Sequence, residues 1–415
     1  MKTRISDLAV FGGAPCFSDQ LHVGRPNIGN RESLMRRIND MLDRRWLTNR
    51  GLYVQEFENE VAKLLGVEHC IAICNGTVAL EIAARALGLC GEVILPSFTF
   101  VATAHALMWQ GITPVFCDID TKTFVLDPRR VEELITPKTT GIVGVHLWGI
   151  PCAIRELSAI ARKHRLKLMF DAAHAFACSF EGIAIGNFGD AEVFSFHATK
   201  ILNTFEGGAI VTNNSELAAK IRSMKNFGFS GYDEVSWLGT NGKMSEISAA
   251  MGLTGLESLD EFIRVNLRNY EVYRCGLEGV SGLQVLTYDI SRRSNFQYVA
   301  IEIDEIAAGI SRNQVMEILW AENVLARRYF YPGCHRMEPY GTLMPDVGSR
   351  LSGTEWLAQR ILVLPTGTAI QRDDIEKICD LIRFSVVHGG EIATKMKANV
   401  FQAVVLNQGD SCPAA

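Results

Sequence analysis

Apolar and polar positions alternate along the first half of the chain in a strand and helix rhythm. Short apolar runs of strand length recur between segments whose apolar residues have helical spacing, at 77–87, 102–108, 129–135 and 154–164. This alternation predicts an α/β fold with a mostly parallel sheet of about seven strands, flanked by helices on both faces. The predicted strands are 71–73, 93–95, 114–116, 142–145, 167–170, 193–196 and 209–211.

The pattern changes on either side of this block. Helical spacing at 31–43 and 53–65 precedes the first strand, and 1–24 has no strong periodicity, so we expect it to lie over the surface. A long helical stretch at 244–274, interrupted near Gly252 and Gly255, leads into a mixed pattern typical of an α+β domain. Its predicted elements are a strand at 296–303 and helices at 312–321, 355–361 and 373–384.

These changes of pattern predict the domain organisation. We expect a large α/β domain at 25–255 and a smaller C-terminal α+β domain at 256–390, with terminal extensions at 1–24 and 391–415. The last extension is compatible with a helix to about residue 405 and is expected to be disordered beyond it.

Composition excludes several classes of protein. The 415 residues are 48% hydrophobic and 21% charged, which is ordinary for a globular protein, and the net charge of -5 argues against a general nucleic-acid binder. Residues 1–18 make a poor signal peptide, and no apolar run is long enough to cross a membrane. The eleven cysteines lack zinc-ligand spacing, so we expect reduced thiols in the cytoplasm and no metal.

Two residues at strand ends carry the first indication of chemistry. Asp171 stands where the strand 167–170 stops, and Lys200 follows the strand 193–196. Ligands of open α/β sheets bind at such strand ends. Pyridoxal 5′-phosphate (PLP) needs a carboxylate at its ring nitrogen and an amine at its aldehyde carbon. Taken singly, Asp171 is better explained as a helix cap and Lys200 as a residue of a surface loop.

The wider context of these two residues resembles a known family. The ordered segments FDAAHA, GD, FSFHATK and EGG, which begin at Phe170 and end at Gly208, resemble the DegT/DnrJ/StrS sugar aminotransferases. The resemblance covers about residues 25–385 and implies a fold-type I PLP-transferase. It implies that Lys200 holds the cofactor and moves protons, and that Asp171 pairs with the ring nitrogen.

A turn after the first strand is expected to bind the cofactor phosphate. Residues 75–80 open a helix, and backbone N–H groups at a helix N-terminus favour an anion. Gly76 allows close approach and Thr77 adds a hydroxyl; the resemblance assigns both, with Ser195, to the phosphate. A plain helix cap is the alternative.

Further cofactor contacts follow from the resemblance. It implies that Phe100 lies flat on the cofactor ring and that His174 positions the ring or its hydroxyl, although a core aromatic and a core histidine are the simpler alternatives. It also implies that Asn241 reaches the neighbouring subunit's cofactor phosphate in a homodimer. Lys243 stands where the family more often has Arg.

The loop 327–335 is rich in cations and aromatics, as a lid over a nucleotide diphosphate would be. By the resemblance, Tyr331 and His335 face the substrate, whereas a solvated loop is the alternative. The chain also departs from the family pattern at Ala198, where Pro is frequent, and at Phe205, where Gly is frequent. Neither departure removes a functional group.

The resemblance implies a PLP-dependent aminotransferase that moves an amino group, from glutamate, to C4 of dTDP-4-keto-6-deoxyglucose. Such products enter deoxyamino-sugar biosynthesis for antibiotics or surface polysaccharides. Amination at C3 of a related sugar is an alternative, because no residue encodes the position for a physical reason. A regulatory protein that binds PLP without turnover is another. Sugar dehydration is disfavoured, because relatives with that activity have His where this chain has Lys200.

Overall fold

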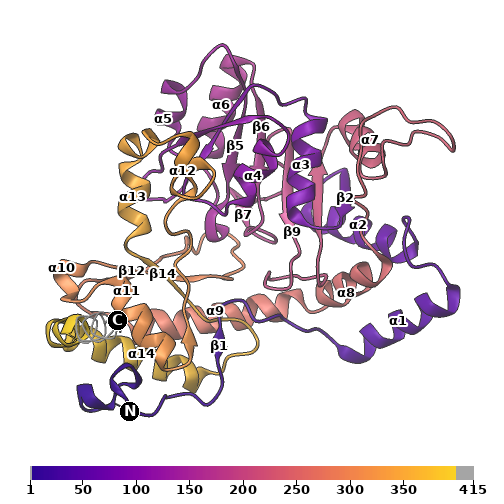
Figure 1. Cartoon of the computed structure of the whole chain (residues 1–415). Coiled ribbons are helices and arrows are strands. Elements are labelled where there is room, and N and C mark those ends of the chain that lie inside the picture. The colour runs from indigo at the N-terminus through magenta and orange to yellow at the C-terminus, as the bar shows by residue number, and fades with distance from the viewer. Residues whose placement is uncertain (1, 399–415) are drawn as a thin grey trace, which may run out of the picture.

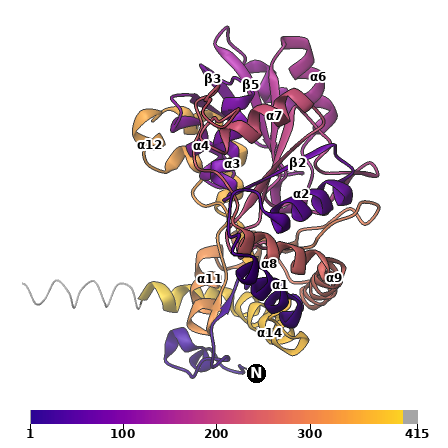
Figure 2. The ribbon, with the colours of Figure 1, turned by 90° about the vertical axis from the view of Figure 1, so that its right-hand side faces the viewer.

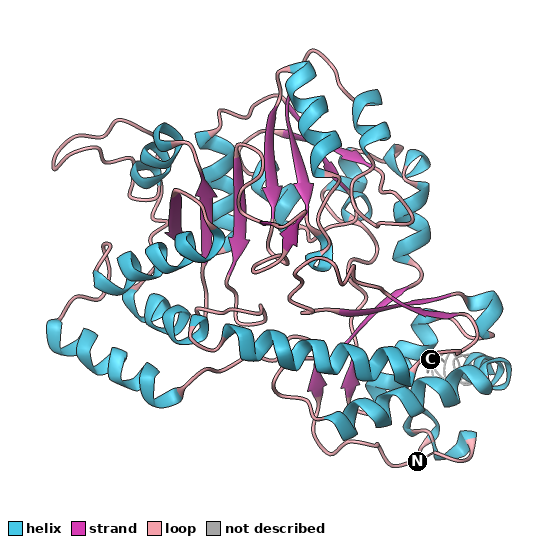
Figure 3. Ribbon diagram, turned by 180° about the vertical axis from the view of Figure 1, so that it is seen from behind, coloured by secondary structure: helices cyan, strands magenta, loops and turns pink. Residues whose placement is uncertain are grey.

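The larger domain is built on a seven-stranded sheet, as the sequence predicts. The computed structural model describes residues 2–398 (Figures 1 and 3). The strand order is β2-β10-β9-β6-β5-β3-β4, and only β10 runs antiparallel to its neighbours. The strands are β2 (His69–Ile73), β3 (Glu92–Pro96), β4 (Thr113–Cys117), β5 (Thr139–Val145), β6 (Lys167–Asp171), β9 (Ala191–Ser195) and β10 (Gly208–Thr212).

Helices cover both faces of this sheet because its strands are buried on both sides. In β2, Cys70 and Ala72 join the core on one face, whereas Ile71 and Ile73 join the core on the other. The predicted α/β class is therefore confirmed. One face is covered by α2 (Leu52–Leu65), α5 (Pro128–Glu133), α6 (Ile154–His164) and α8 (Glu246–Leu256), and the other by α3 (Gly76–Ala86), α4 (Ala102–Met108) and α7 (Ser215–Met224).

Two consecutive helices, α8 and α9 (Leu259–Gly276), run from the large domain beneath the sheet into the small one (Figure 1). The interruption predicted near Gly252 and Gly255 is confirmed at 257–258, between α8 and α9, although both glycines lie inside α8. A Cβ on Gly252 would lie 2.5 Å from the Phe57 ring. The glycine therefore serves close helix packing rather than a turn.

The small domain contains an antiparallel sheet in the order β11-β12-β14, with α9, α11 and α14 packed around its core. The helix predicted at 355–361 was wrong at its end, because the four apolar residues of β14 are too short a run to distinguish a buried strand from a helix. The bounds are β11 (Leu283–Val285), β12 (Val299–Ile303), β14 (Ile361–Leu364), α10 (Glu305–Ala308), α11 (Arg312–Ala321), α12 (Tyr340–Leu343), α13 (Ser352–Ala358) and α14 (Arg372–Val387).

The N-terminal segment belongs to the core of the small domain. Its strand β1 (Leu21–His22) pairs with β13 (Val324–Leu325), and the buried Glu322 carboxylate accepts the N–H groups of Ala9 and Cys16 at 2.7 Å. The expectation that 1–24 lies over the surface is therefore wrong for its apolar side chains. The buried ones are Ile5, Leu8, Phe17 and Leu21.

The C-terminal end of the described chain also contributes to the small-domain core, through Ile392 and Met396. The expectations for 399–415 lie outside the described residues. No helix within residues 2–398 is long and apolar enough to cross a membrane. The other elements are α1 (Arg31–Arg44), β7 (Ser179–Phe180) and β8 (Ile183–Ala184).

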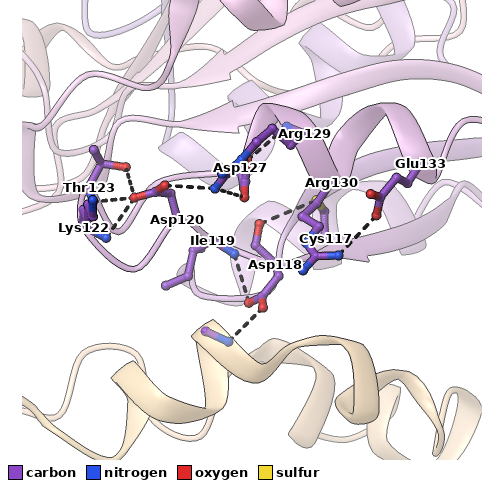
Figure 4. A network of polar contacts seen from close by, with 11 residues as sticks. Cys117, Asp118, Ile119, Asp120, Lys122, Thr123, Asp127, Arg129, Arg130 and Glu133 are labelled. Carbon is purple, nitrogen blue, oxygen red and sulfur yellow. Dashed lines mark hydrogen bonds and ion pairs between the residues drawn. The ribbon is translucent and has the colours of Figure 1, made fainter.

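Seen from the side, the molecule has two lobes (Figure 2). A polar contact between the large domain and α13 comes from Asp118, which follows β4 and faces the C-terminal part of the chain (Figure 4). Its carboxylate accepts the backbone N–H groups of Gly353 and Thr354, each at 2.8 Å, at the start of α13. The end of β4 is thereby held against α13.

Candidate active site

A cleft of about 480 Å³ lies where the ends of β2, β6 and β9 meet the small domain. Tyr298, which precedes β12, and side chains of the segment 325–330 form its opposite wall. The fold thus brings together most of the site residues that the sequence predicts. Those lining the cleft are Gly76, Thr77, Phe100, Asp171, His174, Ser195 and Lys200.

Asp171 lies at the bottom of this cleft and is held from two sides. The Thr103 hydroxyl donates to its Oδ2 at 2.8 Å, and the Ala173 N–H donates to its Oδ1 at 3.0 Å. Burial raises the pKa of Asp171, while these two donors and Lys200 act in the opposite direction. Thr103 is a functional residue that sequence reasoning missed, although it lies only three residues after Phe100.

Lys200 lines the same cleft, in the turn that follows β9. Its backbone N–H donates to the His197 carbonyl at 2.9 Å, and its Nζ lies 3.4 Å from the Tyr298 hydroxyl. Burial lowers the pKa of Lys200 from 10.5 to about 8, and Asp171 opposes this shift. At pH 7 about a tenth of the side chain is therefore the free amine that can attack an aldehyde.

His174 is a neutral imidazole of defined tautomer. Its Nδ1 accepts the Trp148 N–H at 3.2 Å, so its proton is on Nε2. Burial, followed by the charge of Lys200, holds the pKa of His174 well below its ordinary value. The ring lies 4.5 Å from that of Tyr298 between centroids. Tyr298 precedes β12 of the small domain, so its place near Lys200 is visible only after folding.

The other end of the cleft is built to receive an anion. Asn75 caps α3 by accepting the Val78 N–H at 2.8 Å, and Gly76 and Thr77 form the first turn beside it. A Cβ on Gly76 would lie 3.1 Å from the Cβ of Ser195, so glycine lets the turn approach that hydroxyl. A helix N-terminus beside hydroxyl groups suits a phosphate.

The small-domain wall supplies a cation that the sequence reasoning did not assign to the site. Arg327 lines the cleft, and its backbone pairs with Val363 through bonds of 2.9 and 2.8 Å. Its guanidinium lies over the Tyr329 ring at 5.6 Å. No carboxylate among the described residues forms an ion pair with it, so its charge is available to an anionic ligand.

Neither of the two predicted substrate contacts lines this cleft. The prediction that His335 faces the substrate is contradicted, because its side chain is 1% exposed and its ring bonds to Ser97 and Glu355. Tyr331 instead packs its ring against two cations, with Arg328 at 4.4 Å and Arg312 at 5.3 Å. Both side chains therefore contact protein groups, most of which lie outside their own loop.

Asn241 also lies outside the cleft of its own chain. It is exposed, in a loop held against the end of β2 by the bond from the Cys74 N–H to the Gly242 carbonyl at 2.8 Å. The structure therefore leaves the side chain available to another subunit but does not show one.

The arrangement fits PLP along its whole length. Asp171 matches the pyridine nitrogen, Lys200 the aldehyde, and the α3 turn with Ser195 the phosphate, while Phe100 and His174 line the space between. Within residues 2–398 no three His, Cys, Asp or Glu side chains form a group that could hold a metal ion.

Comparison with known proteins agrees with this fit. Residues 29–383 match the DegT/DnrJ/EryC1/StrS aminotransferase family. The dTDP-4-amino-4,6-dideoxy-D-glucose transaminase of Shigella dysenteriae is 39% identical over 88% of this chain and 98% of its own. The GDP-perosamine synthase of Caulobacter vibrioides is 35% identical over 82% and 91%.

Among solved structures, DesI in the presence of its TDP-sugar product has a TM-score of 0.90 and 50% identity, over 95% of this chain and all of that one. The match to the family model spans most of the chain and includes both Asp171 and Lys200. The chain therefore belongs to the DegT/DnrJ/EryC1/StrS aminotransferase family, whose members are PLP-dependent enzymes.

Proposed function

We propose that this enzyme transfers an amino group from glutamate to C4 of dTDP-4-keto-6-deoxyglucose. The observation that carries the proposal is the convergence of Asp171, Lys200 and an anion-binding helix terminus on one cleft. The choice of nucleotide sugar is supported by the relatives named for dTDP-4-amino-4,6-dideoxy-D-glucose and by DesI. We place the product in deoxyamino-sugar biosynthesis.

The chemistry divides between the cofactor and the protein. PLP, when bound, withdraws electrons from the substrate carbon that loses a proton. Asp171 holds the proton on the ring nitrogen, which maintains that electron demand. Lys200, with its pKa lowered to about 8, accepts the proton from one carbon and returns it to another near neutral pH.

The other cleft residues orient the cofactor and exclude water. Phe100 would cover one face of the ring, and the neutral His174 would offer its Nε2–H to the ring hydroxyl. The α3 turn and Ser195 hold the phosphate. Each of these roles requires the side chain to line the cleft, as all of them do.

Arg327 is proposed to bind the diphosphate of the nucleotide sugar. Its fixed backbone, its place on the small-domain wall and its free charge support this role. A guanidinium donates two parallel hydrogen bonds to a phosphate, which gives orientation as well as affinity.

We further propose a cytoplasmic homodimer in which Asn241 contacts the phosphate of the partner's cofactor. Asn241 is exposed, and apolar side chains in and after α1 are left uncovered, as expected where a second copy would pack. Free thiols throughout residues 2–398 suit a reducing compartment. The uncovered side chains are Met35, Leu42, Trp46, Leu47 and Leu52.

Two alternatives remain for the experiment to separate. Amination at C3 needs the same cofactor machinery, so only product analysis distinguishes it. A regulatory protein that binds PLP without turnover has no use for a proton-transferring amine. The lowered pKa of Lys200 and the buried Asp171 therefore favour the enzyme.

The test begins with absorption spectroscopy of the purified protein. We expect a visible band from lysine-bound cofactor, which glutamate converts to the pyridoxamine phosphate spectrum. Incubation of that form with 3-keto and 4-keto dTDP-sugars, and with a GDP-linked 4-keto sugar, should yield a product whose new amine NMR places at C4 of the dTDP-sugar. A band that glutamate does not bleach would favour the regulatory protein, and a Lys200→Ala variant that still transaminates would remove the mechanism.

A further inference from the structure

His335 occupies a contact between two segments that are distant in the sequence. Its Nδ1 lies 2.7 Å from the Ser97 hydroxyl, and its Nε2 lies 2.8 Å from a carboxylate oxygen of Glu355. Burial lowers the pKa of His335, although Glu355 opposes this shift. A neutral ring with its proton on Nε2 satisfies both partners, since it donates to Glu355 and accepts from Ser97.

The backbone next to His335 strengthens the same contact. The His335 N–H donates to the Ser97 hydroxyl at 3.1 Å, and the Cys334 N–H donates to the Ser97 carbonyl at 2.9 Å. The Cys334 thiol lies 3.3 Å from the Thr99 carbonyl. Ser97 is completely buried, so water does not compete for these bonds. The loop at 334–335 therefore holds residues 97–99 on their small-domain side.

The same segment is also fixed on the cofactor side. The hydroxyl of Thr99 lies 3.1 Å from that of Thr103, which donates to Asp171. Phe100 is the next residue, and its side chain is 56% exposed and lines the cleft. An aromatic ring that is half exposed has little packing of its own to fix it, so its direction depends on the backbone that carries it.

We infer that His335 is a positioning residue that orients Phe100 toward the cofactor ring by fixing the segment 97–100 from the small domain. This inference rests on the proposed role of Phe100 as the residue that covers the ring. One aromatic neighbour is consistent with a Phe100 ring directed into the cleft. Phe330, which also lines the cleft, lies 6.2 Å from Phe100 between ring centroids. Glu355 of α13 anchors the imidazole from behind.

Three substitutions separate the two bonds of the imidazole. Asn at 335 retains an acceptor near the position of Nδ1 for Ser97, Gln retains a donor near the position of Nε2 for Glu355, and Leu retains neither. The readouts are the dissociation constant of pyridoxamine 5′-phosphate, which forms no bond to Lys200, and the visible circular dichroism of bound PLP. For His335→Leu and His335→Gln we expect the dissociation constant to rise about tenfold and the dichroism to weaken. For His335→Asn we expect both the dissociation constant and the dichroism to stay near the values of the parent protein.

Two further variants make the outcome decisive. His105→Leu is a matched control, because His105 also bonds across the domain boundary, to the Tyr340 hydroxyl at 2.8 Å, but not to the segment 97–100. It should leave both readouts unchanged. Phe100→Ala should weaken pyridoxamine phosphate binding at least as much as His335→Leu. If Phe100→Ala has its effect and His335→Leu has none, the inference is wrong while the proposed function stands. If Phe100→Ala has no effect, the proposed stacking itself fails. Equal losses in the Asn and Gln variants would also overturn the inference.

Discussion

Replacing Asp171 by Asn should raise the fraction of Lys200 that is free amine and yet slow transamination. The variant keeps its place, since its carbonyl can accept the Ala173 N–H and its amide can donate to the Thr103 hydroxyl. It loses the negative charge that opposes the lowering of the Lys200 pKa. We therefore expect that pKa to fall below about 8, and the free-amine fraction at neutral pH to rise.

The size of the gain follows from the starting value. With a pKa of about 8, Lys200 is already roughly 300-fold richer in free amine at pH 7 than an ordinary lysine of pKa 10.5. Because about a tenth of it is unprotonated, loss of the Asp171 charge can raise the free-amine fraction by at most about tenfold. Transamination should nevertheless fall by about 10² to 10³, because the ring nitrogen loses the carboxylate that holds its proton.

Competitive labelling of the cofactor-free protein with trace acetic anhydride, read by mass spectrometry from pH 6 to 10, measures the midpoint for each lysine. Labelling of Lys200 should rise with pH through about 8 in the parent and through a lower pH in Asp171→Asn. Lys243, whose pKa burial alone lowers, gives an internal control that the substitution should not move. A Lys200 midpoint near 10.5, or one that stays or rises in the variant, would refute the reasoning.

Three other substitutions test separate parts of the cleft. Tyr298→Phe removes the hydroxyl 3.4 Å from the Lys200 Nζ, so stopped-flow rates of the glutamate half-reaction should fall about tenfold with little change in KM; an unchanged rate would show that the hydroxyl is not used. Gly76→Ala should crowd Ser195 and weaken pyridoxamine phosphate binding about tenfold while leaving pyridoxamine unaffected, and equal losses for both ligands would contradict a phosphate site. Arg327→Gln should raise KM for the nucleotide sugar at least about tenfold but not KM for glutamate, and the reverse pattern would assign Arg327 to the amino donor.

The sequence predicted the large domain well because its signals are local. Buried strands of five to seven residues and the helices between them have distinct periods. Asp171 is the last residue of one such strand, β6, and Lys200 lies in the turn that follows another, β9. The chain itself therefore places them at the same edge of the sheet. The interruption expected near Gly252 and Gly255 follows them, at 257–258, because Gly252 permits close packing against Phe57 within the helix rather than ending it.

The small domain's contribution to the site was not predictable in the same way. Tyr298 lies within the predicted strand 296–303 but just before the observed β12, and its proximity to Lys200 depends on how two domains pack. His335 shows the converse error. A histidine in a loop rich in cations and aromatics resembles a substrate ligand. Only the buried contacts to Ser97 and Glu355 show that both ring nitrogens already have hydrogen-bond partners within the protein.

The cofactor-binding residues were predictable and the substrate-side residues were not, and one physical difference explains both outcomes. A group that binds the cofactor is fixed by its own strand or helix terminus. Its role is therefore visible in the local sequence, for example as a polar residue at the end of a strand or a glycine at the start of a helix. A group that binds the substrate lies on a wall whose position is set by long-range contacts, such as the bonds of Asp118 to α13 and of Arg327 to Val363. Substrate specificity can therefore change without a recognisable local sequence pattern. In agreement, relatives named for dTDP-linked and GDP-linked sugars match this chain at similar identities, 39% and 35%. Variants of Arg327, rather than of Asp171 or Lys200, are where we expect the specificity for the nucleotide to move while the chemistry of amino transfer stays the same.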